Sequence, residues 1–274
     1  MIDRQTNVLF AYVLLLVFVL AAQSQVQLSI LLGIALSTLV VSVVFLLGFL
    51  SLEAIVPAVL VGAIAYGIGG INSVIVLGVF FISASLLTLV NDRGVRKDEM
   101  NESRRGGRQV WSNAFWFVSF LLGSYILNSE SLMIAAISAL ATSSADTWGT
   151  EVGLFPKSKR TISITRFSEV KPGTDGGISL YGTIASLAGS ALIGGVYAYF
   201  LTENDSSTFI MITISGFMGS IFDSIIGDRF QTSADLHAGT PDHGSKFYIS
   251  NNVVNWLSTG LGAIMGLILY HIAR

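Results

Sequence analysis

Apolar segments of helix length recur along the whole chain and constrain its fold more than any other feature. Nine such segments lie at residues 8–22, 28–49, 54–70, 73–90, 111–127, 131–146, 178–201, 208–226 and 253–272. A hydrocarbon layer about 30 Å thick needs roughly 20 apolar residues per helix. Only 12% of the residues are charged, against about 25% in soluble domains. The sequence therefore predicts an all-α integral membrane protein, a polytopic bundle of about nine transmembrane helices.

The basic residues are distributed unevenly between the two sides of this predicted bundle. The connections at 23–27, 70–72, 128–130 and 202–207 contain no Lys or Arg, and all 15 basic residues except Arg274 fall in the segments on the other side. Lys and Arg are enriched in cytoplasmic loops. The amino terminus is therefore expected to be cytoplasmic and the carboxy terminus outside, with the polar clusters at the cytoplasmic face.

No break in composition divides the chain, so residues 1–274 are expected to form a single membrane domain. Residues 1–90 contain mostly Val, Leu and Ile with scattered Gly and are interpreted as structural spans, whereas residues 91–274 contain the polar motifs and are expected to be the catalytic part. The chain has no cysteine, which excludes disulfides, thiolate metal ligands and a cysteine nucleophile.

Two stretches place pairs of carboxylates at the ends of apolar segments. Asp146 and Glu151 form the first pair, and Asp223 and Asp228 form the second. An unpaired charge at membrane depth costs at least about 2.5 kcal/mol, so such acids are candidate functional residues with a cation as partner. Helix residues five apart point roughly 140° apart. Each helix is therefore expected to end between its two acids, and one acid from each stretch is expected to meet the other at a common cation.

A basic, glycine-containing stretch precedes the fifth apolar segment. Gly107 allows a ligand to approach the backbone closely, and Arg108 supplies a planar fork that suits phosphate oxygens. Gln109 and Asn113 share one helix face at i and i+4. Two other interpretations stay open: the basic residues also fit a topology signal, and the amides also fit hydrogen bonds between helices.

Two further polar segments begin the seventh and ninth apolar segments. A glycine-rich stretch at 173–177, preceded by Lys171, runs into a helix, where backbone N–H groups can bind an anion. An ordinary turn with an N-cap explains the same pattern equally well. At the last segment, Asn251 and Asn255 share a helix face, and Asn252 can cap the helix. His237 and His243 lack the further ligands of a zinc site.

Together these groups indicate phosphoryl transfer. Carboxylates that bind Mg²⁺, combined with cations and helix N-termini that bind phosphate oxygens, supply the positioning and charge neutralisation that this reaction needs. A groove among apolar helices favours a lipid phosphate or lipid alcohol as acceptor. A transporter is the alternative, in which the two acid pairs mark half-repeats and an ion path. That alternative requires acids near the membrane midplane, whereas the sequence places these at span ends.

Five ordered motifs resemble those of the membrane-embedded isoprenoid-phosphate kinases, the family that includes the phytyl-phosphate kinase of vitamin E synthesis and transmembrane protein 19. The residues that carry the resemblance are Gly107, Arg108, Gln109, Val110 and Asn113; Ala145, Asp146, Thr147, Glu151 and Gly153; Gly173 through Ser179; Asp223, Ser224, Gly227 and Gln231; and Asn251 through Asn255. The resemblance implies transfer of the terminal phosphate of a nucleoside triphosphate, CTP, to a phytyl- or geranylgeranyl-type monophosphate.

Two observations qualify the resemblance. The Asp146-Thr147 motif is also similar to the acid-hydroxyl motif of polyprenol kinases and CDP-lipid synthases that use CTP, so those reactions are alternatives. The chain differs from the family pattern at Asp228, where a small residue is more usual, and its loop at 227–250 matches no motif.

The resemblance assigns the candidate site residues to three groups. The catalytic group is Asp146, Glu151, Asp223, Arg108 and Lys171, in which the three acids bind Mg²⁺. The group that binds nucleotide phosphates is Lys97, Arg104, Gly107, Gly173, Thr174, Asp175, Gly176 and Gly177. The group that orients the substrate is Gln109, Asn113, Thr147, Asn251, Asn252 and Asn255. The expected partners are a nucleoside triphosphate, an isoprenyl monophosphate and the lipid bilayer, and no nucleic acid.

Overall fold

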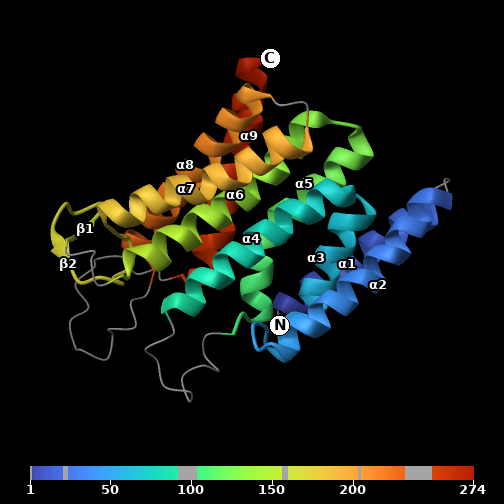
Figure 1. Cartoon of the computed structure of the whole chain (residues 1–274), viewed down its shortest axis with the longest axis horizontal. Helices are drawn as coiled ribbons and strands as arrows, with labels where there is room; N and C mark the ends of the chain where they lie inside the picture. Colours follow the sequence, from blue (N-terminus) through green and yellow to red (C-terminus); the bar gives the residue numbers. More distant parts are fainter. Residues whose placement is uncertain (1, 21–23, 92–103, 156–159, 203–204, 232–248) are drawn as a thin grey trace.

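The chain folds as a helical bundle. The computed structural model describes residues 2–20, 24–91, 104–155, 160–202, 205–231 and 249–274. Within these ranges nine α-helices occupy the nine predicted segments (Figure 1): α1 (Ile2–Leu20), α2 (Ser24–Leu46), α3 (Ile55–Gly67), α4 (Gly70–Asn91), α5 (Gly107–Leu127), α6 (Glu130–Gly153), α7 (Leu180–Gly195), α8 (Ser206–Phe230) and α9 (Asn251–Ala273). A 3₁₀ turn (Leu52–Ala54) precedes α3, and a π-helical turn (Val196–Leu201) extends α7.

Six of the described helices are long and apolar enough to cross a membrane: α2, α4, α5, α7 with its π-helical turn, α8 and α9. The apolar parts of α1 and α3 are shorter, at Arg4–Leu20 and Leu52–Gly67. The helix α6 has 24 residues but is more polar than these six. The chain is thus a nearly all-helical, multi-pass integral membrane protein, and a crossing by all nine helices stays a prediction.

The helix α6 lies at the centre of the bundle. Every residue from Ile134 to Ala145 is buried, and α6 packs against α4, α5, α7, α8 and α9. Small residues allow this close packing, since a Cβ at Gly219 of α8 or Gly262 of α9 would collide with Thr142. Because α6 contacts protein in place of lipid, its hydroxyl and acidic side chains can find polar partners at membrane depth.

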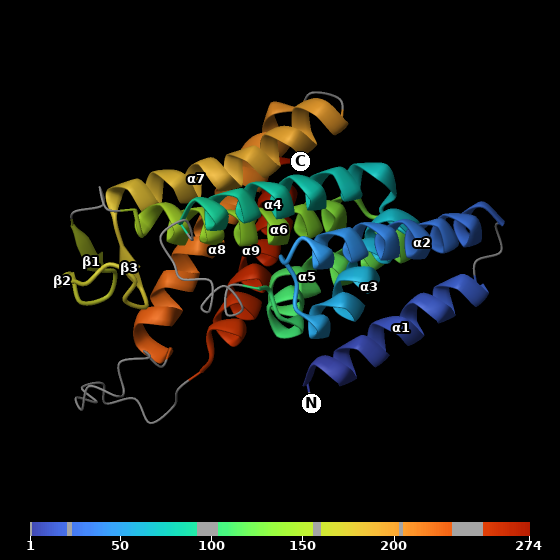
Figure 2. The ribbon, with the colours of Figure 1, turned by 60° about the horizontal axis from the view of Figure 1, so that its bottom comes forward.

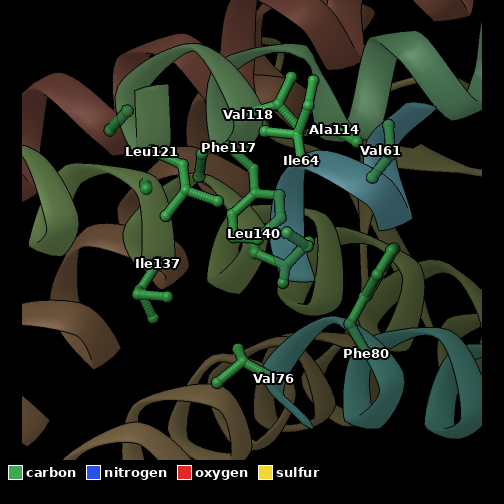
Figure 3. Close-up of a cluster of buried hydrophobic side chains, with 14 of the residues drawn as sticks. Val61, Ile64, Val76, Phe80, Ala114, Phe117, Val118, Leu121, Ile137 and Leu140 are labelled. Carbon is green, nitrogen blue, oxygen red and sulfur yellow. The ribbon is translucent and has the colours of Figure 1, made fainter. Parts of the chain in front are cut away.

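A hydrophobic core fixes α6 against the amino-terminal helices. Ile64 of α3, Phe117 of α5 and Leu140 of α6 are completely buried, and Phe80 of α4 is 7% exposed. Figure 3 shows these side chains converging from the four helices. Residues 1–90 therefore contribute α4 and part of this hydrophobic core to the support of α6, whose other neighbours are α5, α7, α8 and α9.

A small antiparallel sheet, which the sequence interpretation did not include, follows α6. Its strands are β1 (Thr161–Ser163), β2 (Glu169–Val170) and β3 (Gly177–Ile178), in the order β2-β1-β3. Strand β1 pairs Ile162 with Glu169 on one side and with Ile178 on the other. In Figures 1 and 2 the sheet lies at one end of the molecule, beside the start of α7 and far from α1–α3.

Candidate functional site

One acid from each stretch meets the other inside the bundle. Asp146 on α6 and Asp223 on α8 line one cavity, where their carboxyl groups are close enough to interact electrostatically. Asp223 is only 9% exposed, and its Oδ2 accepts a hydrogen bond from Ser258 Oγ of α9 at 2.8 Å. Two adjacent buried carboxylates repel each other when both are ionised, and a bound cation removes that repulsion. We name Asp146 and Asp223 the inner acids.

The other acid of each pair, Glu151 and Asp228, points elsewhere, and we name these two the outer acids. The prediction that each helix ends between its acids is wrong, because α6 continues to Gly153 and α8 continues to Phe230. Continuous helices turn residues five apart to different sides. Glu151 Oε1 accepts a hydrogen bond from Thr88 Oγ1 of α4 at 2.5 Å. The structure therefore directs Glu151 away from the inner acids.

Asp228 is held by the segment that carries the small sheet. Its Oδ2 accepts hydrogen bonds from Ser163 Oγ at 2.6 Å, from the backbone N–H of Thr165 at 3.0 Å and from the Thr165 hydroxyl. Its Oδ1 pairs with the Arg166 guanidinium at 3.0 Å. The Asp228 side chain is completely buried, so these partners compensate its desolvation. This carboxylate fastens the sheet to the end of α8.

A cavity of about 180 Å³ lies beside the inner acids, between α6, α7, α8 and the glycine-rich stretch. One face of each helix lines it, and the residues are Asp146, Gly149, Thr150 and Gly153 of α6; Gly182, Thr183 and Ser186 of α7; and Phe217, Ser220, Ile221, Asp223, Ser224 and Gly227 of α8. Sites that enclose a whole small-molecule ligand typically measure about 300–1,000 Å³. The volume enclosed by the described residues thus suits the charged part of a ligand.

The glycine-rich stretch forms the rim of this cavity as two successive turns. The N–H of Thr174 donates to Lys171 O at 3.1 Å, and the N–H of Gly177 donates to Thr174 O at 2.9 Å. Gly173 and Gly176 have positive φ angles of 86° and 68°, a region that favours glycine. The expectation that this stretch opens a helix directly is wrong, because β3 separates it from α7. Residues Gly173, Thr174, Asp175, Gly176 and Gly177 all line the cavity.

These turns are docked against α8. A Cβ at Gly176 would collide with Asp228 and with Ser224 O, so only glycine allows this approach. Gln231 Nε2 donates to Asp175 Oδ1 at 2.7 Å. Asp228 and Gln231 therefore hold the rim of the cavity at the end of the helix that carries Asp223.

Amides and hydroxyls of α9 approach the inner acids from the other side. Asn251 lines the cavity, and Ser258 bonds Asp223. Asn255 lies between them on the same helix face, at i+4 and i+7 spacing. It is 6% exposed, and among the described residues none donates a hydrogen bond to its Oδ1. Burying an acceptor oxygen without a hydrogen-bond partner costs about 1–3 kcal/mol of stability. This oxygen is therefore a candidate ligand for a bound cation or substrate. The proposed cap Asn252 is wrong, since Ser250 holds the N-cap position.

The donor set fits a hard divalent cation. No group of three or more His, Cys, Asp or Glu within the described residues is placed to hold a metal ion. Mg²⁺, however, is commonly bound by one or two carboxylates together with water and substrate phosphates. Asp146 and Asp223 supply two such carboxylates at the cavity, and the Asn255 amide oxygen, one turn before Ser258 on α9, is a candidate third ligand.

The predicted α5 residues are not among the residues that line the cavity. Asn113 O accepts a hydrogen bond from Ser143 Oγ at 2.9 Å, and Asn113 Nδ2 donates to Gln109 O at 2.9 Å. Thr147 Oγ1 also donates within α6, to Ser143 O at 2.8 Å. Gly107 packs against the backbone of Glu53. Asn113 thus contacts α6 about one turn before Asp146, and its side-chain amide is bonded to the backbone of its own helix.

None of the predicted basic residues that the structure describes lines the cavity. Arg108 and Lys171 are exposed at the start of α5 and beside the glycine turns, while Arg104 lies near Gly48, and Lys97 is outside the described residues. The neighbouring Arg105 was not a predicted site residue. Its guanidinium lies 4.9 Å from the ring centroid of Phe81. Burial lowers its pKa to about 10, and the charge of Glu151 opposes that shift.

Two polar residues of the site were absent from the predicted groups. Ser258 continues the face of Asn251 and Asn255 by one more turn, and extending that i, i+4 pattern to i+7 would have found it. Gln231 follows Gly227 by four residues and is the C-cap residue of α8, where its backbone N–H donates to Gly227 O. Its contact with Asp175 joins segments 56 residues apart, which no local pattern reveals.

Comparisons with known proteins match the chain to integral membrane proteins. The family model "Integral membrane protein DUF92" matches residues 35–263. An uncharacterized membrane protein of Methanocaldococcus jannaschii is 28% identical over 218 residues, covering 80% of this chain and 84% of that protein. The chloroplastic protein VTE6 of Arabidopsis thaliana is 28% identical over 228 residues, covering 80% of this chain and 65% of VTE6. No solved structure matches the chain.

Proposed function

The chain belongs to the DUF92 family of integral membrane proteins, and on that premise we propose that it is an isoprenyl-phosphate kinase. The donor is a nucleoside triphosphate, CTP, and the acceptor is a phytyl- or geranylgeranyl-type monophosphate. The observation that carries the proposal is that Asp146 and Asp223 line one cavity together with the glycine turns of residues 173–177. The match to VTE6 supports it, together with the motifs that resemble isoprenoid-phosphate kinases.

The inner acids and Asn255 are the proposed ligands of Mg²⁺, which would neutralise phosphate charge when bound. Glu151 is not in this set, because its carboxylate is bonded to Thr88. The backbone of residues 173–177 faces the cavity and is the proposed contact for the nucleotide phosphates, with the exposed Lys171 adding positive charge. Asn251 is the proposed polar contact for the acceptor. This arrangement supplies the charge neutralisation on which phosphoryl transfer depends.

The proposed reaction needs no general base. An oxygen of the acceptor phosphate bonds to the terminal phosphorus of the nucleotide, the bond from that phosphorus to the bridging oxygen breaks, and the nucleoside diphosphate leaves. A phosphate monoester has its second pKa near 6, so the acceptor is already ionised at neutral pH. We place the site at the cytoplasmic face, where the basic segments are expected and where nucleotides are available.

The direct test is to incubate the detergent-purified chain with Mg²⁺, geranylgeranyl monophosphate and CTP labelled in either the γ- or the α-phosphate. The kinase transfers the γ-label to a lipid diphosphate and leaves the α-label in CDP. A CDP-lipid synthase would instead place the α-label in the lipid and release pyrophosphate. No label in the lipid from either nucleotide would refute both reactions.

Cation-coupled transport is the second candidate function, and one observation favours it. The inner acids are seven residues from the ends of α6 and α8, which is roughly 10 Å inside by the helical rise. Acids inside the bundle, and not at its surface, are what an ion path requires. Cation flux into protein-containing liposomes without nucleotide, abolished by Asp223→Asn, would support transport over the kinase.

A further inference from the structure

The lining of the cavity extends along α8. It includes Gln231, which follows the helix, and Phe217 fourteen residues earlier, a separation of about 20 Å by the helical rise. Asp223 lies between these two ends of the lining.

The two ends differ in polarity. At the Gln231 end the walls are the glycine turns and Asp175, with Leu154 and Ile178 at the rim. At the Phe217 end the lining is Phe217, Ile221 and the two hydroxyls of Ser186 and Ser220. These hydroxyls bond each other at 2.9 Å, which joins α7 to α8 and satisfies both groups. The inner end therefore suits an apolar ligand group.

The apolar lining continues onto the exposed surface of α8. Ile210, Ile214, Phe217 and Ile221 follow i, i+4, i+7 and i+11 spacing and so share one helix face. Ile210 is 52% exposed and Ile214 is 44% exposed. Because α8 is apolar enough to cross a membrane, this face provides an apolar path from the cavity to the surrounding lipid.

We propose that the acceptor is bound as an amphiphile, with its phosphate at the inner acids and its alkyl tail running past Phe217 and Ile221 along α8. The nucleotide then enters from the opposite end, beside residues 173–177. This assignment rests on the proposed kinase function for the identity of the phosphate acceptor. It makes Phe217 and Ile221 determinants of tail binding, and it excludes short water-soluble phosphates as good acceptors.

Photo-crosslinking tests the path without requiring turnover. The purified full chain is incubated with geranylgeranyl monophosphate that carries a diazirine at the end of its tail, irradiated and digested. We expect the label within residues 210–221, and we expect excess unmodified geranylgeranyl monophosphate to compete it away. Label on α1–α3 or on α5 would overturn the proposed path. Labelled α8 in a protein that makes no lipid diphosphate would keep the path and refute the kinase.

A matched pair of phenylalanines on α8 provides the kinetic test. Phe217→Ala removes a cavity side chain, and Phe222→Ala removes the same side chain from a position outside the cavity lining. Losing one buried aromatic contact is expected to raise KM for geranylgeranyl monophosphate about tenfold. KM for CTP should stay unchanged, and Phe222→Ala should leave both constants unchanged.

Two further measurements serve as controls for this kinetic test. Phe217→Leu, which keeps an apolar side chain, covers the case in which Phe217→Ala fails to fold, and it should raise KM for the lipid by a smaller factor. Dimethylallyl monophosphate, whose tail is too short to reach Phe217, should be a poor acceptor for both the parent and the variants. An equal increase in KM for CTP and for the lipid, or efficient use of the short acceptor, would overturn the proposal.

Discussion

The inner acids and the outer acids lie on the same two helices, five residues apart, yet their surroundings differ. Asp228 accepts four hydrogen bonds, one of them from the Arg166 guanidinium. Glu151 accepts a hydrogen bond from Thr88 and interacts with the charge of Arg105. Asp146 and Asp223, in contrast, line the same cavity, and the hydroxyl of Ser258 donates to Asp223.

This difference agrees with the proposed division of the four acids into structural and catalytic ones. A buried carboxylate that cations and hydroxyls already compensate contributes to holding the fold together. Two adjacent carboxylates in one cavity are stabilised when a cation binds between them. We therefore expect substitutions of the inner acids and of the outer acids to differ in their effects.

Substitution of the inner acids is expected to have the largest effect on activity. Asp146→Asn and Asp223→Asn keep the side-chain shape and remove one charge from the cavity. Loss of a group that positions transition-state charge typically costs roughly 10²–10³-fold in kcat. We expect such a loss in γ-label transfer, with an unchanged or higher thermal unfolding midpoint, because one of two repelling charges is gone. A fully active Asn variant would refute a catalytic role for the inner acids.

Substitution of Asn255 is expected to cause a smaller loss of activity. Asn255→Ala removes the unpartnered Oδ1, so we expect the Mg²⁺ concentration for half-maximal activity to rise about tenfold, equivalent to roughly 1.4 kcal/mol. The unfolding midpoint without Mg²⁺ should change little, because no described residue donates to that oxygen. The measurement is a Mg²⁺ titration of label transfer. An unchanged titration would remove Asn255 from the cation site.

The outer acid Asp228 should affect stability more than chemistry. Asp228→Asn breaks the ion pair with Arg166, whose side chain is 41% exposed, and we expect a loss of about 1–3 kcal/mol. Without this ion pair the glycine turns of residues 173–177 are held less firmly against α8. We therefore expect a higher KM for CTP and a kcat within a few-fold of the parent. Thermal unfolding and steady-state kinetics check both expectations. A loss of kcat as large as that of Asp223→Asn would contradict the division on α8.

Glu151 provides the matching control on α6. Glu151→Gln retains an oxygen that can accept the hydrogen bond from Thr88, and it removes only the charge. We expect kcat within about threefold and a destabilisation of about 1 kcal/mol, the size of a modest charge interaction. If label transfer falls as far as in Asp146→Asn, then Glu151 belongs with the inner acids.

The smallest effect is expected at Asp205, the N-cap of α8, far from both acid groups. The hydrogen bond from Thr208, with help from Ser207 and Arg274, lowers the pKa of this carboxyl to about 2. A lowered pKa stabilises the fold above the unfolded value of about 3.9, and that contribution is lost as pH falls towards 2.

Asp205→Asn is therefore expected to flatten the decline of the unfolding midpoint between about pH 4 and pH 2, and to leave activity at neutral pH unchanged, since Asn caps helices about as well as Asp. A pH series of thermal unfolding curves in detergent measures this. An unaltered decline would show that other carboxyls control acid stability.

The helices of the bundle could be predicted from the local hydropathy of the sequence, because an apolar segment of helix length is what a membrane-spanning helix requires. Each predicted segment holds a described helix. The small sheet could not be predicted, since two-residue strands such as Gly177–Ile178 are too short to show an alternating pattern. The central position of α6 in the bundle could not be predicted from the sequence either, because its Ser, Thr and Ala residues are also common in helices at the surface of a protein.

Composition and periodicity are local properties, so the sequence was enough to predict the membrane class, the helix positions and which residues could carry charge chemistry. Which acids lie together depends on tertiary structure. Helix continuity turns Glu151 and Asp228 towards their own partners, and the packing of α6, α8 and α9 brings Asp146 and Asp223 to one cavity, with Ser258 bonded to Asp223. That grouping depends on the rotation and packing of helices far apart in the chain, which no local pattern records.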